Sequence, residues 1–335
     1  MPQFDVLSGR HVRQILAADP TLALRAVARA YLDHHDGKTA NPHSQFLRFP
    51  DRELDRIISL PASLGEESGV AGIKWIASFP GNASLGLARA SAVLVLNDLR
   101  TGYPFALMES SWISAARTAA SAVLGAGWMS GQQRRAGTLG VIGAGLIARA
   151  TLDAFVADGW RFDEIRVHDL SAGAAEQGAL DARQRWPQGR AEPAPLARAL
   201  AADVVLFATT AGKPYVLPPA SFAAGQIVLN LSLRDIAPEL ILEADNLFDD
   251  VDHCLRASTS PHLAEQLCGH RDFATGTLAQ LMRGSIALDR SRPLVFSPFG
   301  MGILDLALGK EIYHLALEQK LTVSVPDFFG EPGAR

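Results

Sequence analysis

The residues with the clearest chemical signature lie in the stretch 137–169. Gly143, Gly145 and Ala148 follow a short apolar run, 139–142, in the spacing G-x-G-x-x-A. The first glycine permits a tight turn, the second lets the backbone approach a pyrophosphate, and the small third residue lets a helix pack close to the strand. The free N–H groups at the start of that helix attract phosphate. The pattern predicts a dinucleotide-binding site, and an ordinary strand-turn-helix corner is the alternative.

An acid in the expected place favours NAD as the dinucleotide. Asp169 directly follows a second strand-like run, 165–168, and lies 21 residues beyond Ala148. A carboxylate at this position accepts hydrogen bonds from the ribose hydroxyls and repels a 2′-phosphate, so NAD is favoured over NADP. Thr209 and Thr210 end a later strand-like run and should line the same crevice. The residues predicted to bind NAD are Gly143, Gly145, Leu146, Ile147, Asp169, Thr209, Thr210, Ser232, Met301 and Gly302.

Two cations occur inside apolar segments. Lys74 lies in the strand-like run 70–79, and the period-two alternation of a strand makes it face either solvent or an anion. Arg117 is the only charge in the interior of a helix-like segment rich in small residues, 111–129. A buried arginine without a partner is strongly destabilising. Arg117 therefore requires an acidic ligand or an internal salt bridge, for example to Glu109.

One acid follows a predicted strand in the second half of the chain. Asp235 comes shortly after the apolar run 227–231. At the carboxyl end of a parallel strand it would lie where a nicotinamide ring binds. The alternative is that Asp235 caps a short helix that begins near Ala237.

The predicted elements divide into two parts. From residue 139 onward, apolar strand-like runs alternate with helix-length segments, which is typical of a parallel sheet covered by helices. Before residue 130 we expect helices and two hairpins, 41–61 with a charged turn at 50–55, and 90–108. The prediction is an α/β chain with a Rossmann-type doubly wound NAD-binding domain, 131–299. A discontinuous α+β substrate-binding and dimerisation domain, 1–130 and 300–325, completes it, and its last helix returns to the N-terminal lobe.

Composition narrows the classes of partner. The 335 residues are 48% hydrophobic and 20% charged, with a net charge of −4. This charge gives no electrostatic reason to bind nucleic acid or an anionic membrane, so we expect a small-molecule partner. The chain has no apolar run long enough for a membrane span, and its start lacks a signal-peptide pattern. The two cysteines have no metal-ligand spacing. We therefore expect a cytoplasmic protein without a metal site.

Five motifs carry a resemblance to a known family. They are I-K-W-I-A-S-F-P-G-N, T-G-Y-P-F-A-L-M-E, A-A-R-T-A-A-S, G-A-G-L-I-A and N-L-S-L-R-D. In their order, over about residues 40–305, the chain resembles the ornithine cyclodeaminase/μ-crystallin family. The resemblance implies that Lys74 and Arg117 hold the α-carboxylate of an amino-acid substrate and that Asp235 is the catalytic acid/base. It also implies a homodimer. A forked guanidinium and a point-charge ammonium suit a carboxylate.

Further motifs narrow the resemblance to the diaminopropionate-forming branch of that family. They are N-P-H-S-Q-F-L-R, D-R-I-I-S-L-P, R-A-S-A-V-L-V-L-N-D and S-P-F-G-M-G-I. The branch implies oxidative cleavage of N-(2-amino-2-carboxyethyl)-L-glutamate with NAD, giving 2,3-diaminopropionate and 2-oxoglutarate. Hydride leaves Cα, and the resulting imine is hydrolysed. Such an activity belongs to siderophore or peptide-antibiotic biosynthesis.

Two positions distinguish the chain from its relatives. Ornithine cyclodeaminases carry an acid near the position of Ile58, whereas this chain has Arg56 nearby. Many family members carry a basic residue near Ser44, and here only Arg48 is close. Arg48 and Arg56 are therefore the candidates for the additional carboxylates of the substrate. Ornithine cyclodeamination, ketimine or opine-type reduction, and non-catalytic binding of NAD(P)H or another ligand are the alternative functions.

Overall fold

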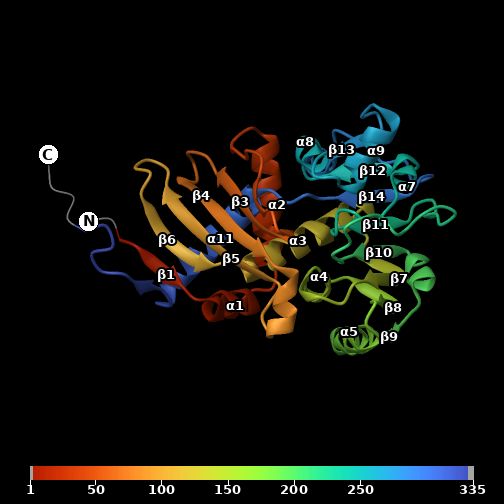
Figure 1. Cartoon of the computed structure of the whole chain (residues 1–335), viewed down its shortest axis with the longest axis horizontal. Helices are drawn as coiled ribbons and strands as arrows, with labels where there is room; N and C mark the ends of the chain where they lie inside the picture. Colours follow the sequence, from red (N-terminus) through yellow and green to blue (C-terminus); the bar gives the residue numbers. More distant parts are fainter. Residues whose placement is uncertain (1–2, 331–335) are drawn as a thin grey trace. The chain divides into compact units, whose positions relative to one another are not determined.

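The computed structural model describes residues 3–330, whose contacts divide the chain into two units (Figure 1). Unit 1 contains the residues up to Arg117 and those from Met301 onward, and unit 2 is Thr118–Gly300. The division falls inside helix α3, Ser111–Met129. The sequence-based boundary at residue 130 corresponds to the end of this helix, because sequence patterns mark element ends and not the point where contacts change partner.

Unit 1 is built on one mixed sheet with helices on it. Its strands are β1 Asp5–Leu7, β2 Gln45–Phe49, β3 Arg52–Ser63, β4 Val70–Ser78, β5 Ala90–Asp98, β6 Pro104–Glu109 and β15 Val323–Ser324. Their order is β15-β1-β6-β5-β4-β3-β2, in which β1 runs parallel to β6 and the other neighbours are antiparallel. The helices are α1 Gly9–Ala18, α2 Leu22–His35, the 3-10 helix η1 Pro80–Leu85 and α11 Gly302–Glu318.

Helix α11 lies against the sheet of unit 1. It contacts β3, β4 and β5, and α1 and α2 pack against it (Figure 1). The final helix thus returns to the N-terminal part of the chain, as the sequence predicts. Gly309 allows this close approach, because a Cβ atom there would lie 2.2 Å from Leu94 Cδ2. On β4 the helix-facing residues include Lys74, whereas its neighbour Trp75 is 42% exposed on the other face.

The first hairpin differs from the sequence prediction. The charged segment 50–55 is predicted as a turn, but β3 already begins at Arg52 and pairs with Phe49 after a register shift. The turn is therefore shorter than predicted. Glu53 and Leu54 are exposed at this outer corner, where charged side chains remain solvated in a strand and discourage edge-to-edge pairing. Charge alone is consequently a poor marker of the turn.

Unit 2 contains one parallel sheet. Its strands are β7 Arg135–Ile142, β8 Arg161–His168, β9 Arg190–Pro193, β10 Val204–Phe207, β11 Ile227–Asn230, β12 Asp245–Phe248, β13 Ala274–Thr277 and β14 Leu294–Ser297. Besides the greater part of α3, its helices are α4 Leu146–Ala157, α5 Ala172–Arg185, α6 Leu196–Leu200, α7 Pro238–Leu242, α8 Val251–Cys254, α9 Ser260–Cys268 and α10 Leu278–Met282. None of the helices in the described part of the chain combines the length and apolarity that crossing a membrane requires.

The strand order of unit 2 is that of a doubly wound fold. The order is β13-β12-β14-β11-β10-β7-β8-β9, and all neighbours are parallel. The chain first moves outward from β7 to β8 and β9, and then continues from β10 in the other direction. Ligands in such sheets bind at this switch point, at the carboxyl ends of β7 and β10. Both β10 and β11 are buried along their whole length, so the predicted Rossmann-type α/β fold is confirmed.

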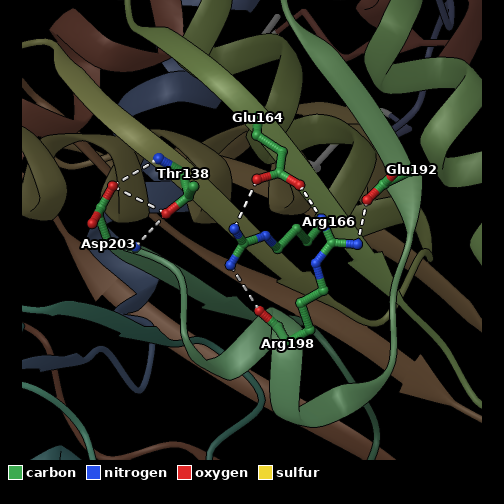
Figure 2. Close-up of polar contacts among 6 residues, drawn as sticks. All are labelled: Thr138, Glu164, Arg166, Glu192, Arg198 and Asp203. Atoms are coloured by element: carbon green, nitrogen blue, oxygen red, sulfur yellow. Dashed lines mark hydrogen bonds and ion pairs between the residues drawn. The ribbon is translucent and has the colours of Figure 1, made fainter.

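An ion-pair network joins the outer strands of unit 2 to helix α6 (Figure 2). Glu164 on β8 lies 2.7 Å from Arg166 and 2.5 Å from Arg198, and Arg198 also pairs with Glu192 on β9. Arg166 donates in addition to the main-chain oxygen of Arg198 at 3.1 Å. Two arginines and two glutamates thus hold β8, β9 and α6 together.

Candidate active site

Two buried cations of unit 1 converge on one buried acid. Lys74 Nζ lies 2.7 Å from Asp305 Oδ2, and Arg117 Nε lies 3.2 Å from Asp305 Oδ1. Lys74 is 1% exposed, Arg117 is 8% exposed and Asp305 is fully buried. Ser114 Oγ accepts hydrogen bonds from Lys74 at 3.2 Å and from Arg117 at 3.5 Å. We call Lys74, Arg117, Asp305 and Ser114 the cation cluster.

Three separate elements supply the cation cluster. Lys74 projects from the interior strand β4 toward helix α11, between the cross-strand neighbours Leu60 and Leu94. Arg117 lies in α3, three residues after Ser114, so both side chains share one face of that helix. Asp305 lies in the first turn of α11, where a carboxylate also interacts favourably with the helix dipole. The sequence therefore folds three distant segments around one carboxylate.

Arg117 does form an internal salt bridge, one of the two alternatives that the sequence leaves open, but its partner is Asp305 and not Glu109. Glu109 does not pair with Arg117, but accepts hydrogen bonds from the backbone N–H groups of Ser111 at 2.8 Å and Trp112 at 3.5 Å. An acid just before a helix satisfies free N–H groups, which explains its position. Solvation of Lys74 is excluded by its burial, so its anion is Asp305.

The cation cluster carries more positive than negative charge. Among the described residues Asp305 is the only acid paired with Lys74 or Arg117. The pKa of Lys74 is lowered to about 8, first because burial disfavours the ammonium and second because the Arg117 cation is near, while Asp305 acts in the opposite direction. A buried excess of positive charge is unfavourable unless an anion binds it, so the cluster is suited to a carboxylate ligand.

In unit 2 the glycine turn has the geometry that its sequence predicts. Gly143 has φ +91°, and a Cβ atom there would lie 2.5 Å from the main-chain oxygen of Ala208. Only glycine fits this turn between β7 and α4. A Cβ atom at Gly145, the N-cap of α4, would meet no atom within 4 Å. The backbone of Gly145 is therefore open to a ligand at the helix N-terminus, next to Leu146 and Ile147.

Asp169 and the glycine turn lie together. Asp169 Oδ2 accepts a hydrogen bond of 2.9 Å from Ala144 N, and Oδ1 accepts one of 2.9 Å from Ser171 N. These contacts place the carboxylate directly after β8, beside the carboxyl end of β7. This is the position at which the sequence predicts a carboxylate for the ribose hydroxyls of a dinucleotide.

Asp235 lies fully buried in a small polar cluster. Its Oδ1 accepts hydrogen bonds from Thr209 Oγ1 and from Tyr215 Oη, the latter at 2.8 Å. Its Oδ2 has no hydrogen-bond partner among the described residues. Ser232 Oγ accepts from Thr209 N at 2.8 Å, which ties the carboxyl ends of β10 and β11 together. One carboxylate oxygen is therefore held by two hydroxyls, and the other is a buried acceptor without a hydrogen-bond partner in the described part of the chain.

The alternative role of Asp235 as a helix cap is wrong. The short helix α7 begins at Pro238, and its N-cap is Ala237. The main-chain oxygen of Asp235 instead accepts from Tyr215 N at 3.0 Å and Val216 N at 2.9 Å. Burial and the charge of Asp235 raise the pKa of the Tyr215 hydroxyl, so this hydroxyl stays protonated and donates to the carboxylate.

Comparison with known proteins identifies the family of this chain. Residues 6–320 match the model of the ornithine cyclodeaminase/mu-crystallin family. The chain belongs to this family. It is 30% identical over 310 residues to N-((2S)-2-amino-2-carboxyethyl)-L-glutamate dehydrogenase of Staphylococcus aureus, with 88% of this chain and 90% of the relative covered. It is 25% identical to alanine dehydrogenase of Archaeoglobus fulgidus over 96% of this chain and 98% of that protein.

Solved structures of other proteins share the fold of this chain. The Δ1-pyrroline-2-carboxylate reductase of Thermococcus litoralis, in complex with NADH and L-proline, has a TM-score of 0.86 at 23% identity. The match covers 96% of this chain and 100% of that one. An archaeal alanine dehydrogenase dimer with bound NAD also has a TM-score of 0.86, at 24% identity, over 97% and 100% of the two chains.

The remaining predicted site residues lie in both units. Arg48 on β2 and Arg56 on β3 are cross-strand partners in unit 1. Met301 and Gly302 begin helix α11, and a Cβ atom at Gly302 would lie 2.9 Å from the main-chain oxygen of Leu60. Thr210 is exposed just after the β10 strand. In unit 1 the structure thus brings Lys74 and Arg117 together, and in unit 2 it brings Asp235, Thr209 and Ser232 together.

Sequence patterns do not point to two residues of the candidate site. Asp305 resembles any acid that complements the dipole in the first turn of a helix, and its partner Lys74 is 231 positions away. Tyr215 lies in an irregular segment after Gly212, where no periodicity assigns a direction to its side chain. The only signal for Asp305 in the sequence is that two cations in apolar segments have no identified acidic partner.

Proposed function

We propose that this protein is an NAD-dependent dehydrogenase that cleaves N-(2-amino-2-carboxyethyl)-L-glutamate to 2,3-diaminopropionate and 2-oxoglutarate. Family membership supports the coarser class of NAD-dependent amino-acid dehydrogenases, cyclodeaminases and reductases. The observation that carries the proposal is the buried cation cluster, in which two cations share one carboxylate. The choice of N-(2-amino-2-carboxyethyl)-L-glutamate as the substrate is supported by the 30% identical Staphylococcus aureus relative, which is a dehydrogenase of this compound.

The overall reaction consumes one water. The substrate is a secondary amine, and its glutamate-derived Cα–H leaves as hydride while the nitrogen loses a proton. The resulting carbon–nitrogen double bond is attacked by water, and the carbon–nitrogen bond then breaks. The products are 2,3-diaminopropionate, 2-oxoglutarate, NADH and one proton.

In the proposed reaction the cation cluster binds the α-carboxylate at the carbon that is oxidised. Arg117 offers a planar fork and Lys74 a point charge, which together fix both the position and the tilt of a carboxylate. Asp305 holds the two cations at their places and cancels one of their two charges. Fixing the substrate in this way removes much of the entropic barrier to the chemical step.

The residues of unit 2 fit NAD. The open backbone at Gly145 and the N-terminus of α4 suit the pyrophosphate, and Asp169 suits the adenosine ribose. Thr209 and Ser232 lie at the carboxyl ends of β10 and β11, where open α/β sheets bind their ligands. When bound, NAD supplies a hydride acceptor, and the protein residues supply binding and proton transfer.

Asp235 is the proposed acid/base. Thr209 and Tyr215 occupy its Oδ1, so proton transfer is assigned to Oδ2. This oxygen takes the amine proton and releases it to solvent, which is the one proton of the overall reaction. It then takes a proton from the water that attacks the double bond and returns it to the nitrogen that leaves. Replacing Asp235 with Asn keeps the shape but removes the base. We expect kcat to fall by 10²–10⁴-fold, with NADH affinity unchanged in a fluorescence titration. Wild-type turnover by this variant would contradict the assignment.

Parallel assays test the proposed function. Wild-type protein with NAD and N-(2-amino-2-carboxyethyl)-L-glutamate should accumulate NADH, measured by its absorbance. With ornithine in place of the adduct, ornithine loss without net NADH would indicate cyclodeamination, in which the hydride is returned. Turnover only of imines with NADH would indicate a reductase. Binding of NADH with no turnover of any of these compounds would indicate a non-catalytic protein.

We also propose that the protein acts in the cytoplasm as a homodimer. On the sheet face of unit 1 opposite Lys74, the cross-strand neighbours Trp75 and Val93 are 42% and 38% exposed, and Leu47 is 47% exposed. Apolar residues gathered on one face suit a second copy of the chain. The dimeric state of the archaeal alanine dehydrogenase supports this proposal. Light scattering should give twice the chain mass, and Trp75→Glu should lower it.

A further inference from the structure

We propose that Ser110 is a further substrate-binding residue of unit 1, whose hydroxyl group donates a hydrogen bond to the α-carboxylate at Lys74 and Arg117. This assignment rests on the proposed function, because it adds one contact to the carboxylate site that the cation cluster forms. The added contact comes from a neutral residue, so it leaves the charge of the site unchanged.

The Ser110 hydroxyl is buried without a hydrogen-bond partner. Ser110 is 0% exposed, and its Oγ bonds no other group in the described part of the chain. Its main chain is fully engaged, since its N–H donates to Ala92 O at 2.9 Å and its carbonyl oxygen accepts from Ser114 N at 2.9 Å. Nearly all buried polar groups of proteins form hydrogen bonds, so this exception requires an explanation.

Capping of helix α3 does not explain this serine. Ser110 stands directly before the helix, where a serine hydroxyl ordinarily accepts a hydrogen bond from an N–H group of the first turn. Here the carboxylate of Glu109 takes this role, because it accepts from Ser111 N at 2.8 Å and from Trp112 N at 3.5 Å. The neighbouring acid therefore leaves the Ser110 hydroxyl to another partner.

Strand register directs Ser110 to the same face of the sheet as Lys74. Lys74 pairs with Leu94 across the sheet. Leu94 in turn pairs with Met108, which lies two residues before Ser110. Directly paired residues, and residues two apart along a strand, project to one face. The hydrogen bond from Ser110 N to Ala92 O continues this ladder one step beyond β6, so the alternation still holds at Ser110.

Helix α3 places Ser110 in line with its two residues of the cation cluster. Ser110, Ser114 and Arg117 follow one another at intervals of four and three residues, the spacing of one helix face. Side chains four residues apart on a helix have Cβ atoms about 6 Å apart, so an oxygen atom between the two serines lies about 3 Å from both hydroxyls. Ser114 Oγ lies 3.2 Å from Lys74 Nζ. A carboxylate oxygen beside the cations can therefore reach Ser110 as well.

A hydroxyl donor suits this position chemically. An ionised carboxylate only accepts hydrogen bonds and offers about four lone-pair sites, so it can bind a serine in addition to two cations. A hydrogen bond to a charged acceptor is also stronger than one between neutral groups. In the free protein the same hydroxyl is buried and unpaired, which is unfavourable. Ser110 should therefore lower the stability of the free protein and raise its affinity for the substrate.

Ser110→Ala separates these two effects. Titration calorimetry uses NADH-bound protein, which does not turn over N-(2-amino-2-carboxyethyl)-L-glutamate. We expect the Kd of this compound to rise about tenfold, because a hydrogen bond to a charged group is lost. Without substrate the melting temperature should equal or exceed that of wild-type protein, because an unpaired buried hydroxyl is removed. In steady-state assays KM should rise about tenfold and kcat should stay within threefold.

Ser78→Ala is the matched control. Ser78 is another buried serine on the Lys74 face of the sheet, but its Oγ accepts a hydrogen bond of 2.9 Å from Arg89 Nη1. This variant should have a lower melting temperature and a Kd within twofold of wild type. An unchanged Kd in Ser110→Ala, or failure of this variant to fold, would assign Ser110 a structural role and overturn the inference.

Direct binding distinguishes this contact from the proposed function. If wild-type protein binds N-(2-amino-2-carboxyethyl)-L-glutamate without oxidising it, and Ser110→Ala weakens that binding, the contact stands and the proposed reaction fails. If wild-type protein oxidises the compound and Ser110→Ala binds it equally well, the reaction stands and the contact is overturned. If wild-type protein neither binds nor oxidises the compound, both are overturned.

Discussion

Two clusters of charged residues in this protein have opposite characters. The cation cluster of unit 1 is buried and contains two cations for one acid. The ion-pair network of unit 2 contains two arginines and two glutamates, and its Arg198 and Glu192 side chains are 47% and 41% exposed (Figure 2). Both clusters join distant segments, but only the first has a charge left to neutralise.

The comparison distinguishes charges that bind a ligand from charges that only hold elements of the fold together. Exposed ion pairs are screened by water and contribute little, so a balanced network can be retained for local order alone. A buried excess charge is costly, and a protein tolerates it where a ligand of opposite charge completes the balance. Burial together with imbalance, and not the number of ion pairs, therefore supports the proposal that the cation cluster is a binding site.

The largest expected effect comes from removing the shared acid. Asp305→Asn leaves Lys74 and Arg117 buried without a counter-charge, which typically costs about 3–5 kcal/mol. Urea unfolding should show this loss of free energy, and a carboxylate substrate should recover part of it by binding. The double variant Lys74→Met/Asp305→Asn restores the original charge balance and should be more stable than Asp305→Asn alone. Wild-type stability of Asp305→Asn would show that the pairing contributes nothing.

A rise in pH above about 8 should weaken substrate binding at the cation cluster. Because the pKa of Lys74 is lowered to about 8, its ammonium is lost in the free protein as pH rises through this value. We expect the substrate Kd to be constant below pH 8 and to rise above it, by up to about tenfold per pH unit. Calorimetry across this range measures the effect, and Lys74→Met should bind weakly with no such dependence. A wild-type Kd that stays constant to pH 10 would contradict the role of Lys74.

The same pKa has the opposite consequence for folding. Unfolded Lys74 has its ordinary pKa of 10.5, so between pH 8 and 10.5 the unfolded state binds more protons than the folded state. Stability contributed by Lys74 therefore rises with pH in this window. Comparison of wild-type protein with Lys74→Met isolates this contribution.

The smallest effect is expected in the balanced network. Arg198→Gln removes pairs with Glu164 and Glu192 that are partly exposed, so it should cost less than about 1 kcal/mol. Its effect should shrink in high salt, and KM and kcat should stay at wild-type values. Thermal melts at two salt concentrations with steady-state assays measure these quantities. A change in KM would assign the network a role in binding.

Much of the fold follows from local patterns. The G-x-G-x-x-A turn, the alternation after residue 139 and the apolar runs of β10 and β11 predict the doubly wound unit, because each depends on neighbours within a few residues. The start of β3 cannot be predicted from local patterns, because charged residues are compatible with both a turn and an exposed strand end. The short strands β9, β13 and β15 carry too few residues to show a period.

Only part of the candidate site can be predicted from the sequence. Lys74 and Arg117 attract attention because a charge inside an apolar segment needs an explanation. Asp305 does not, because it looks ordinary where it stands and acquires its partner from a residue on another element. Tertiary pairing thus decides which ordinary charged residues become part of a site.

Product stoichiometry tests the proposed function most directly. Wild-type protein, NAD and N-(2-amino-2-carboxyethyl)-L-glutamate are incubated, NADH is followed by absorbance, and the products are quantified by mass spectrometry. The proposal predicts equal amounts of NADH, 2,3-diaminopropionate and 2-oxoglutarate, and their loss in Asp235→Asn. Consumption of the adduct without 2-oxoglutarate, or no consumption by protein that binds NADH, would contradict it.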